Sequence, residues 1–347
     1  TKTTIRLENG LQCDLRAVSN EHFPFALQYF TGSKEHNVAL RSLALKQGLS
    51  LNEYDFTGDG EMPEVHEEGD IYRSLGLLFI PPELRENRGE IEASDQGKLP
   101  DLIKKENLRG TFHNHTTASD GNNSLLEMAE AAHDLGLEYL GIADHSKASF
   151  QANGLNEVRL REQISEIRAL NEQFDDFALI AGSEVDILKD GSLDFDDDLL
   201  QELDYCVASV HNSFTLDEDT MTKRIIRAME NEHVTMLGHV TGRLLLKRDP
   251  YAVNIEKIIA CASETRTVIE LNCSPYRLDM DWRWWKKARE KNVLCSINPD
   301  AHRTEQLQSL SYGVRLARKG WLRRNDVLNT KSLKEVQAWL ALPKSER

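Results

Sequence analysis

The pattern of apolar and polar residues becomes regular near residue 110 and stays regular to the end of the chain. Short apolar segments rich in β-branched residues occur near 110–115, 138–143, 178–187, 204–210, 234–238, 267–272 and 293–297. Amphipathic stretches separate them near 124–135, 156–174, 217–231, 253–264, 281–291 and 304–318, and a last helix is expected at 331–342. Strand–helix alternation repeated seven times predicts parallel strands with right-handed crossovers, closed as a barrel or open as a sheet.

The first hundred residues follow a mixed pattern. Asn9-Gly10 lies between two runs of alternating polarity, which predicts a β-hairpin. Residues 21–48 are typical of helices, with a break at 31–33. The polar stretch that follows residue 80 contains the breaks PPE and KLP and ends near Leu108. We therefore predict a small α+β unit over 1–80, a linker over 81–108 and a large α/β domain over 109–347.

Composition limits the class of protein. Of the 347 residues 40% are hydrophobic and 29% are charged, so the chain can bury a large core and is not disordered as a whole. It has no run of about eighteen apolar residues and no basic-then-apolar start, so we expect no membrane contact and a cytoplasmic location. The five cysteines are odd in number and form no C-x-x-C, which argues against a disulfide framework. The chain starts without Met, and we expect it to be part of a longer protein.

The net charge of −15 argues against a protein coated in nucleic acid. This average hides an asymmetry, because residues 241–330 carry 17 Lys and Arg against 10 Asp and Glu. The rest of the chain carries 25 Lys and Arg against 47 Asp and Glu. A basic lobe of this kind is compatible either with ordinary solvated helix faces or with contact to a phosphate backbone.

Histidines and carboxylates gather where the apolar segments end. Because parallel strands of a barrel present their C-terminal ends on one face, these side chains are expected to meet at one mouth. The candidates are His113, His115, Asp120, His145, Glu184, His211, His239, Asp300 and His302. Imidazole and carboxylate together suit zinc, manganese or iron, and nine candidates exceed the needs of one ion. We therefore predict a cluster of two or three ions, with phosphoester hydrolysis as the leading reaction and amide hydrolysis as its rival.

The motifs H-N-H, S-D-G, A-D-H-S, G-S-E-V-D, S-V-H, L-G-H and P-D-A-H resemble those of the PHP (polymerase and histidinol phosphatase) domain over about residues 109–343. This resemblance implies a distorted (β/α)7 barrel with a centre of two to three divalent ions, manganese or zinc. It implies that one ion is held by His113, His115, Glu184 and Asp300, a second by Glu184, His211 and His239, and a third by Asp120, His145 and His302.

A narrower resemblance points to bacterial family X DNA polymerases. HTTASDG, LGHVTGRLLLKRDPY and YGVRLARKGWL resemble their PHP domain, LQCDLRAV resembles a palm strand, and LQYFTGSKEHN resembles a thumb segment. The resemblance implies that Asp14 is a polymerase metal ligand, with magnesium as its ion. It further implies a nucleotide pocket lined by Tyr29, Phe30, Thr31, Gly32 and Asn37. The alternative for Asp14 is a solvent-facing residue of the hairpin, and the aromatic pair could be core residues.

The family's first two polymerase aspartates lie upstream of the palm strand, and nothing before Thr1 supplies them. Two-metal nucleotidyl transfer needs those carboxylates, so we expect no polymerisation from this chain. The resemblance implies instead a manganese-dependent 3′–5′ exonuclease that acts on DNA 3′ ends in repair, with 3′-phosphatase and abasic-site cleavage as related activities.

Catalytic roles follow from this reading. Glu184 would bridge ions, Asp300 or His302 would carry a proton, and Arg243 would bind phosphate in a fork, unless it is a surface arginine at a strand end. Weaker candidates for DNA contact are Lys247, Arg248, Asn272, Tyr276, Trp282, Trp284 and Trp285, and core packing is the better interpretation for most of the tryptophans.

Two other functions compete with the exonuclease. A small-molecule phosphatase of the histidinol-phosphate or nucleoside-phosphate type fits the negative net charge. A non-catalytic module that stabilises a polymerase is the alternative outside the enzymes. Protein partners cannot be read from the sequence.

Overall fold

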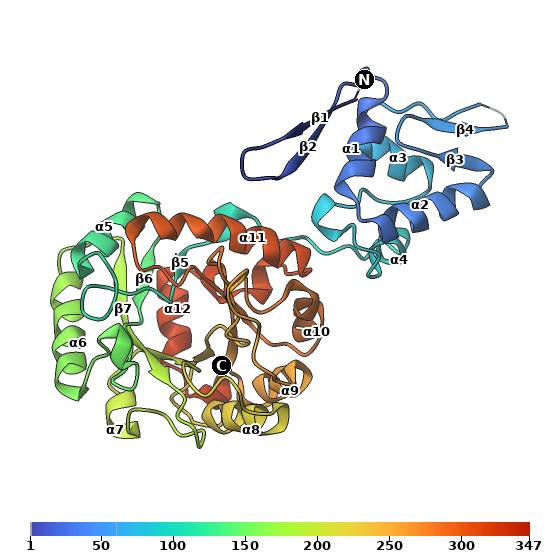
Figure 1. Cartoon of the computed structure of the whole chain (residues 1–347). Coiled ribbons are helices and arrows are strands. Elements are labelled where there is room, and N and C mark those ends of the chain that lie inside the picture. Colours follow the sequence, from blue (N-terminus) through green and yellow to red (C-terminus); the bar gives the residue numbers. More distant parts are fainter. Residues whose placement is uncertain (1, 60) are drawn as a thin grey trace. The chain divides into compact units, whose positions relative to one another are not determined.

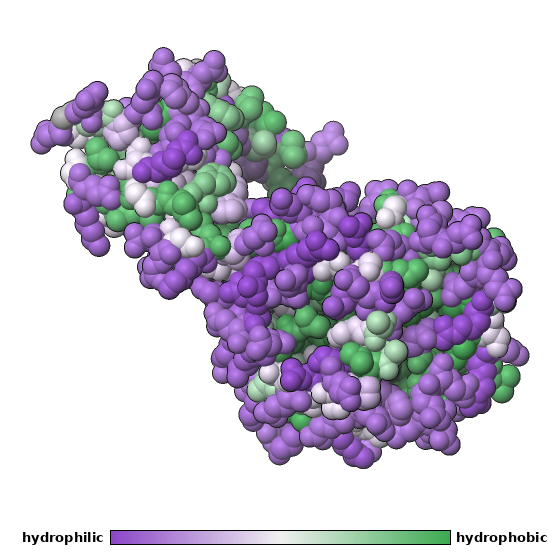
Figure 2. All heavy atoms as spheres, turned by 180° about the vertical axis from the view of Figure 1, so that it is seen from behind, coloured by the Kyte–Doolittle hydropathy of each residue, from purple (hydrophilic) through white to green (hydrophobic). Residues whose placement is uncertain are grey.

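The computed structural model describes residues 2–59 and 61–347, which form two compact units, Thr1–Pro100 and Asp101–Arg347 (Figure 1). Hydrophilic side chains cover most of each unit on the face seen in Figure 2, with smaller hydrophobic groups between them. Within the described ranges, no helix is both long enough and apolar enough to cross a membrane.

The first unit is a small α+β arrangement. Its hairpin consists of the antiparallel strands β1 (Lys2–Arg6) and β2 (Gln12–Arg16), and Gly10 supplies the positive φ of the turn. The remaining elements are α1 (Phe23–Thr31), α2 (Lys34–Lys46), β3 (Leu49–Leu51), β4 (Phe56–Gly58), α3 (Glu68–Ser74), η1 (Pro82–Leu84) and α4 (Glu90–Asp95). The expected helix break falls between α1 and α2, where the Ser33 hydroxyl accepts a hydrogen bond from the His36 amide and begins α2.

The stretch proposed as a linker, 81–108, is divided between the two units. Residues up to Pro100 belong to the first unit, where Arg85 and Glu90 are fully buried. The Glu90 carboxylate lies 2.6 Å from Nδ1 of buried His36, and the Arg85 guanidinium binds Glu68 at 2.7 Å. These buried contacts hold α4 and the preceding turn against α2 and α3, so this part of the stretch packs with the first unit.

The second unit is a nearly closed barrel of seven parallel strands, as the alternation predicts. In sequence and spatial order they are β5 (Gly110–Thr111), β6 (Tyr139–Ile142), β7 (Ala178–Asp186), β8 (Tyr205–Ser209), β9 (Met236–Leu237), β10 (Val268–Asn272) and β11 (Cys295–Asn298). The first and last strands approach at a seam, where a parallel bridge joins Asn114 to Ala301 and the His115 amide donates to the Ala301 carbonyl at 2.8 Å. The predicted seven-stranded parallel fold is confirmed.

Helices surround the strands (Figure 1). They are α5 (Leu125–Asp134), α6 (Glu157–Asn171), α7 (Asp197–Leu200), α8 (Glu218–Met229), α9 (Ile255–Thr265), α10 (Trp285–Glu290), α11 (Leu310–Lys319) and α12 (Leu333–Leu340). Short 3-10 helices are η2 (Lys105–Asn107), η3 (Phe150–Ala152), η4 (Trp282–Trp284), η5 (Thr304–Ser309), η6 (Arg324–Asp326), η7 (Leu328–Thr330) and η8 (Lys344–Glu346). Five α-helices begin at polar caps that accept a backbone hydrogen bond from three residues on: Ser124, Asn156, Asp217, Asn254 and Ser332.

Alternate residues of each strand point into and out of the barrel. On β8, Tyr205 and Val207 pack in the interior cluster, whereas Cys206 and Ala208 pack against the helices. The Tyr205 ring fills the space beside Gly182 of β7, where an added Cβ would lie 2.2 Å from the ring. The same alternation along β7 carries Ile180, Gly182 and then Glu184 to the inside, so the core ends at the C-terminal mouth with a carboxylate.

Candidate metal centre

Glu184 lies at the centre of a ring of histidines. Its Oε1 is 2.9 Å from His239 Nε2 and 3.2 Å from His211 Nε2. Its Oε2 is 3.0 Å from His145 Nδ1 and 3.2 Å from His113 Nε2. Glu184 is buried, and these four rings reach it from loops and ends of four different strands. One buried carboxylate therefore faces four imidazoles.

The other predicted ligands extend this ring on the side of the seam. Asp300 Oδ1 is 3.2 Å from Nε2 of His115, and Asp120 Oδ1 is 3.3 Å from Nε2 of His302. Three groups place ligand atoms within 4.8 Å of one another: His115 with Asp120, His145 and His302; His113 with His115 and Asp300; and His145 with Glu184 and His211. All nine predicted ligands thus lie at the mouth, with His239 joined to the groups through Glu184.

The ring nitrogens of this cluster are short of hydrogen bonds. Within the described residues, six buried nitrogens have no hydrogen-bond partner: Nε2 of His113, both nitrogens of His115, Nδ1 of His145, Nε2 of His211 and Nδ1 of His239. Buried polar atoms are normally paired, so such a concentration needs an explanation. Divalent ions would bind these ring nitrogens through their lone pairs. Imidazole and carboxylate are ligands that suit such ions.

The electrostatics of the cluster are governed by burial and by the closeness of carboxylates to imidazoles. Burial would raise the pKa of Glu184, but the charges of His113 and His211 hold it well below its usual range. Burial lowers the pKa of His145 to about 3, which keeps that ring neutral. Burial also opposes the charge on His302, yet its hydrogen bond with Asp120 and the nearby Asp300 raise its pKa to about 9. Ionised carboxylates thus share the site with both neutral and protonated rings.

Three buried carboxylates behind the ligands were not among the predicted site residues. Glu270 lies 2.6 Å from His113 Nδ1 and accepts the His239 backbone amide at 2.7 Å. Asp186 lies 3.2 Å from His211 Nδ1, and Asp144 accepts hydrogen bonds from Thr116 and Ser119 in the loop that leads to Asp120. Charged residues inside otherwise apolar strand segments, as in VIELN and GIAD, are the signal that could have found two of them.

Two family models match the chain: the DNA polymerase beta thumb over residues 26–86 and the PHP domain over residues 111–274. Over these two ranges the chain matches a polymerase beta thumb followed by a PHP domain. It is 42% identical over 344 residues to a Bacillus subtilis (strain 168) protein named "DNA polymerase/3'-5' exonuclease PolX", an alignment that covers 98% of this chain. The chain spans 60% of the length of that relative.

More distant likenesses cover the PHP domain. A protein of Thermoanaerobacter sp. (strain X514) named "Probable phosphatase" is 27% identical over 229 residues, 63% of this chain and 89% of the relative. A crystal structure of histidinol phosphate phosphatase from Lactococcus lactis, complexed with zinc, L-histidinol and phosphate, has a TM-score of 0.46 and 15% identity. It covers 61% of this chain and 93% of that chain.

The guanidinium of Arg243, the predicted phosphate clamp, forms its hydrogen bonds with other groups of the PHP domain. Its Nε donates to the Arg277 carbonyl at 2.8 Å, and its other nitrogens contact the Leu278 carbonyl and Asp281. Arg243 thus fixes the loop after β10. Arg277, on that loop, donates from Nε to Asp300 at 3.1 Å, while its buried Nη1 has no hydrogen-bond partner among the described residues. The arginine with an unused donor beside the ligands is therefore Arg277.

Other candidates of the PHP domain lie at its mouth or in its packing. Asn272 donates to Asp300 at 3.0 Å, so it orients a predicted ligand. Lys247 Nζ lies 5.2 Å from the Tyr276 ring, and the Arg248 guanidinium binds the Gly242 carbonyl. Trp285 is fully buried, while Trp282 and Trp284 are half-buried.

The predicted nucleotide residues lie together in the thumb, between α1 and α2. The Tyr29 and Phe30 rings meet edge to face at 4.9 Å, and the Asn37 amide donates to the Tyr29 carbonyl at 2.8 Å. The Thr31 hydroxyl donates to the Leu27 carbonyl, and Gly32 follows as the helix cap. Phe30 is exposed and Asn37 is buried, so among these residues the Phe30 ring, and not the Asn37 amide, is accessible to a ligand.

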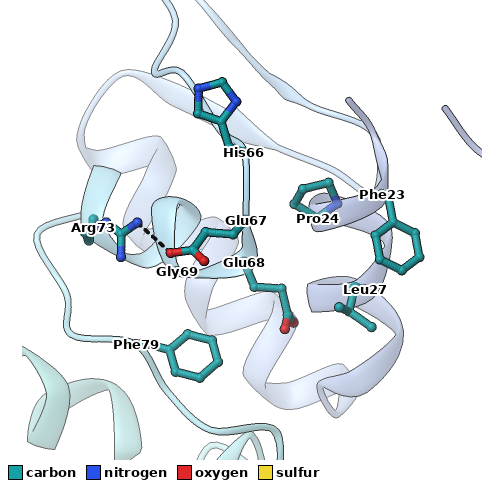
Figure 3. Close-up of a pocket in the computed structure, with 9 residues that line it drawn as sticks. All are labelled: Phe23, Pro24, Leu27, His66, Glu67, Glu68, Gly69, Arg73 and Phe79. Atoms are coloured by element: carbon teal, nitrogen blue, oxygen red, sulfur yellow. Dashed lines mark hydrogen bonds and ion pairs between the residues drawn. The ribbon is translucent and has the colours of Figure 1, made fainter. Parts of the chain in front are cut away.

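Asp14 stands on the exposed hairpin of the first unit. It is 2.8 Å from Lys2 Nζ and accepts a hydrogen bond from Thr4 at 2.6 Å, and these partners lower its pKa to about 2. A separate cavity of about 480 Å³ in the same unit is lined by Phe23, Pro24, Leu27, His66, Glu67, Glu68, Gly69, Arg73 and Phe79 (Figure 3). None of the predicted nucleotide residues lines it, so the cavity is not the predicted pocket.

Proposed function

We propose that this chain is a metal-dependent phosphoesterase that shortens DNA from the 3′ end, a 3′–5′ exonuclease. The observation that carries this proposal is the set of buried ring nitrogens that make no hydrogen bond although they crowd around Glu184, Asp300 and Asp120 at the mouth of the PHP barrel. Ions bound by these residues, manganese or zinc, would polarise a phosphoester and activate water for attack on it. The proposed ligands are the nine residues predicted from the sequence.

The protein's own groups would supply the rest of the chemistry. Arg277 Nη1 is the donor available for a phosphate oxygen, and guanidinium binds phosphate with directed hydrogen bonds. Glu184 would hold the ions close to one another, and His302 would hold or release a proton next to Asp120 and Asp300. Asn272 keeps Asp300 in place through its amide.

DNA is favoured as the substrate by three facts. The relative from Bacillus subtilis carries "DNA polymerase/3'-5' exonuclease" in its name, and the chain also contains a polymerase beta thumb. Residues 241–330, which include the loops after β9 and β10, carry an excess of positive charge on an otherwise acidic protein. Such a local excess attracts a phosphate backbone. A small-molecule phosphatase is the second candidate, because the relative from Thermoanaerobacter is named as a phosphatase.

The test follows an end-labelled, 3′-recessed primer with Mn²⁺, with and without EDTA. Glu184→Gln is the site variant, and Glu264→Gln, an exposed residue of α9, is the matched control. Stepwise shortening that EDTA and Glu184→Gln abolish, and that Glu264→Gln retains, supports the exonuclease. An intact primer, together with release of phosphate from histidinol phosphate or a nucleotide, would instead support the small-molecule phosphatase. Inactivity on every substrate would refute both.

A further inference from the structure

A tight turn between β9 and α9 presents a leucine to solvent. A short antiparallel bridge joins Leu244 to Arg248, and Leu244 accepts the amides of Lys247 and Arg248 at 2.9 and 2.8 Å. At the tip, Leu246 is fully exposed and has φ of +63°. A branched side chain is strained in the left-handed region, and its exposure leaves apolar surface in contact with water. A polar residue such as Asn would avoid both the strain and the exposed apolar surface. The presence of leucine at this position therefore needs an explanation.

The turn rests on the rim of the proposed metal centre. The Leu245 amide donates to the Tyr276 carbonyl at 2.6 Å, and Lys247 Nζ lies over the Tyr276 ring. Tyr276 is 59% exposed, and the next residue, Arg277, binds Asp300. An exposed leucine, an exposed ring and a lysine ammonium therefore share one edge of the mouth.

A second exposed ring flanks the same mouth on the loop after β6. Phe150 is 85% exposed, and it follows Ser149, whose hydroxyl lies 3.3 Å from His211 Nδ1 and donates to Asp186. Apolar side chains thus stand on two loops whose neighbouring residues contact the predicted ligands or their partners. Single exposed apolar residues are ordinary on a protein surface. At the rim of a polar site suited to phosphate, however, such residues match a ligand that has both charged parts and flat apolar parts.

We propose that Leu246 and Tyr276 form a wedge that parts the last base pair of a DNA duplex. This inference rests on the proposed function. Five of the predicted ligands, His113, His115, His145, Glu184 and His239, are buried, so a 3′-terminal phosphodiester held in a duplex cannot reach them without leaving the base stack. Apolar wedges, leucine among them, unstack base steps in other DNA-binding proteins. Here Leu246 takes the place of the departing base, Tyr276 stacks on the pair that remains, and Lys247 faces a backbone phosphate.

Leu246→Asn tests the wedge without disturbing the turn, because Asn tolerates a positive φ. The matched control is Leu135→Asn: Leu135 is also exposed, but it caps the C-terminal end of α5, at the opposite end of the barrel from the mouth. With Mn²⁺, cleavage rates are compared for primers with a paired and with a mismatched 3′ terminus. The Leu246 variant is expected to lose about 10-fold more on the paired than on the mismatched end, since a mismatched end is already open. Equal losses on both ends would overturn the wedge.

A second measurement needs no cleavage. A primer with 2-aminopurine at its paired 3′ end is titrated with protein in EDTA, while anisotropy of a 5′ label follows binding. We expect the wild type and Leu135→Asn to raise the 2-aminopurine fluorescence at saturation, and Leu246→Asn to bind with a much smaller rise. No rise with bound wild type would overturn the wedge. If the wild type opens the end but never cleaves DNA, the proposed function fails while the wedge stands.

Discussion

Replacement of Glu270 by Gln would test how the PHP site holds its ligands. Glu270 is fully buried on β10 and accepts four hydrogen bonds. Two come from His113 Nδ1 and from the His239 backbone amide, at 2.6 and 2.7 Å, and two from the side-chain amides of Asn298 and Asn272, at 3.0 and 3.2 Å. The carboxylate thus orients one predicted ligand ring and anchors the backbone of another.

The Gln side chain keeps the shape but not the acceptors. Its amide nitrogen would face one of the donors that Glu270 now satisfies, and the bond to His113 would lose its charge. Removal of a carboxylate partner behind a metal-binding His lowers metal affinity about 10- to 100-fold, or about 1.4–2.7 kcal/mol. The free energy of unfolding without metal should fall by about 1–3 kcal/mol, since a buried donor loses its acceptor.

Competition of the protein with a chromogenic chelator for Zn²⁺ and for Mn²⁺ measures the affinity, and thermal melting of the metal-free protein measures folding. Glu264→Gln makes the same chemical change on an exposed face of the helix before β10 and should leave both quantities at wild-type values. Wild-type metal affinity in a folded Glu270→Gln protein would refute the reasoning, because it would mean that the orientation of His113 does not depend on this carboxylate.

Three further predictions follow from the same contacts. Arg277→Lys should lower kcat/KM about 10-fold or more in whichever phosphoester assay responds to Glu184→Gln, because Lys lacks the fork that binds Asp300 and phosphate together, whereas metal content should stay constant. Asp144→Asn should loosen the 116–120 loop and raise its hydrogen–deuterium exchange, since Asp144 accepts the Thr116 amide at 2.8 Å. Ellman's reagent at pH 8 should titrate one thiol in the native chain, Cys13, and five in guanidinium, because burial raises the pKa of the other four thiols.

The positions of the predicted ligands follow from simple periodicity. Each strand of the barrel lies within a predicted apolar segment or one residue beyond it, because strands buried on both faces of an α/β barrel are continuously apolar. Once the strands are placed, the C-terminal ends share a mouth, and alternation decides that Glu184 points inward. The arrangement of the nine candidates therefore depends on local sequence alone, apart from the closure of the barrel.

The supporting residues depend on contacts between distant segments. Glu270 contacts His113, which lies 157 positions away in the sequence. Only the structure shows that Arg243 is bound to the carbonyls of the loop after β10, while Nη1 of Arg277 on that loop makes no hydrogen bond. Local sequence contains no signal for such pairings. The same limit explains the stretch after residue 80, whose polar composition indicates a linker, although Glu90 is buried there by its partner His36.

The loops that close the barrel also carry two of the predicted ligands. Asp120 and His302 lie on the loops after the first and last strands, and Asn122 ties those loops together by donating its backbone amide to the His302 carbonyl at 2.8 Å and its side-chain amide at 3.2 Å. The ligands around Glu184 come instead from strands that are paired along the sheet. Because the seam has fewer strand contacts than the sheet, a destabilised protein should lose Asp120 and His302 from the site before it loses the ring around Glu184. Metal stoichiometry should therefore fall in steps as denaturant increases, with the seam ion released first.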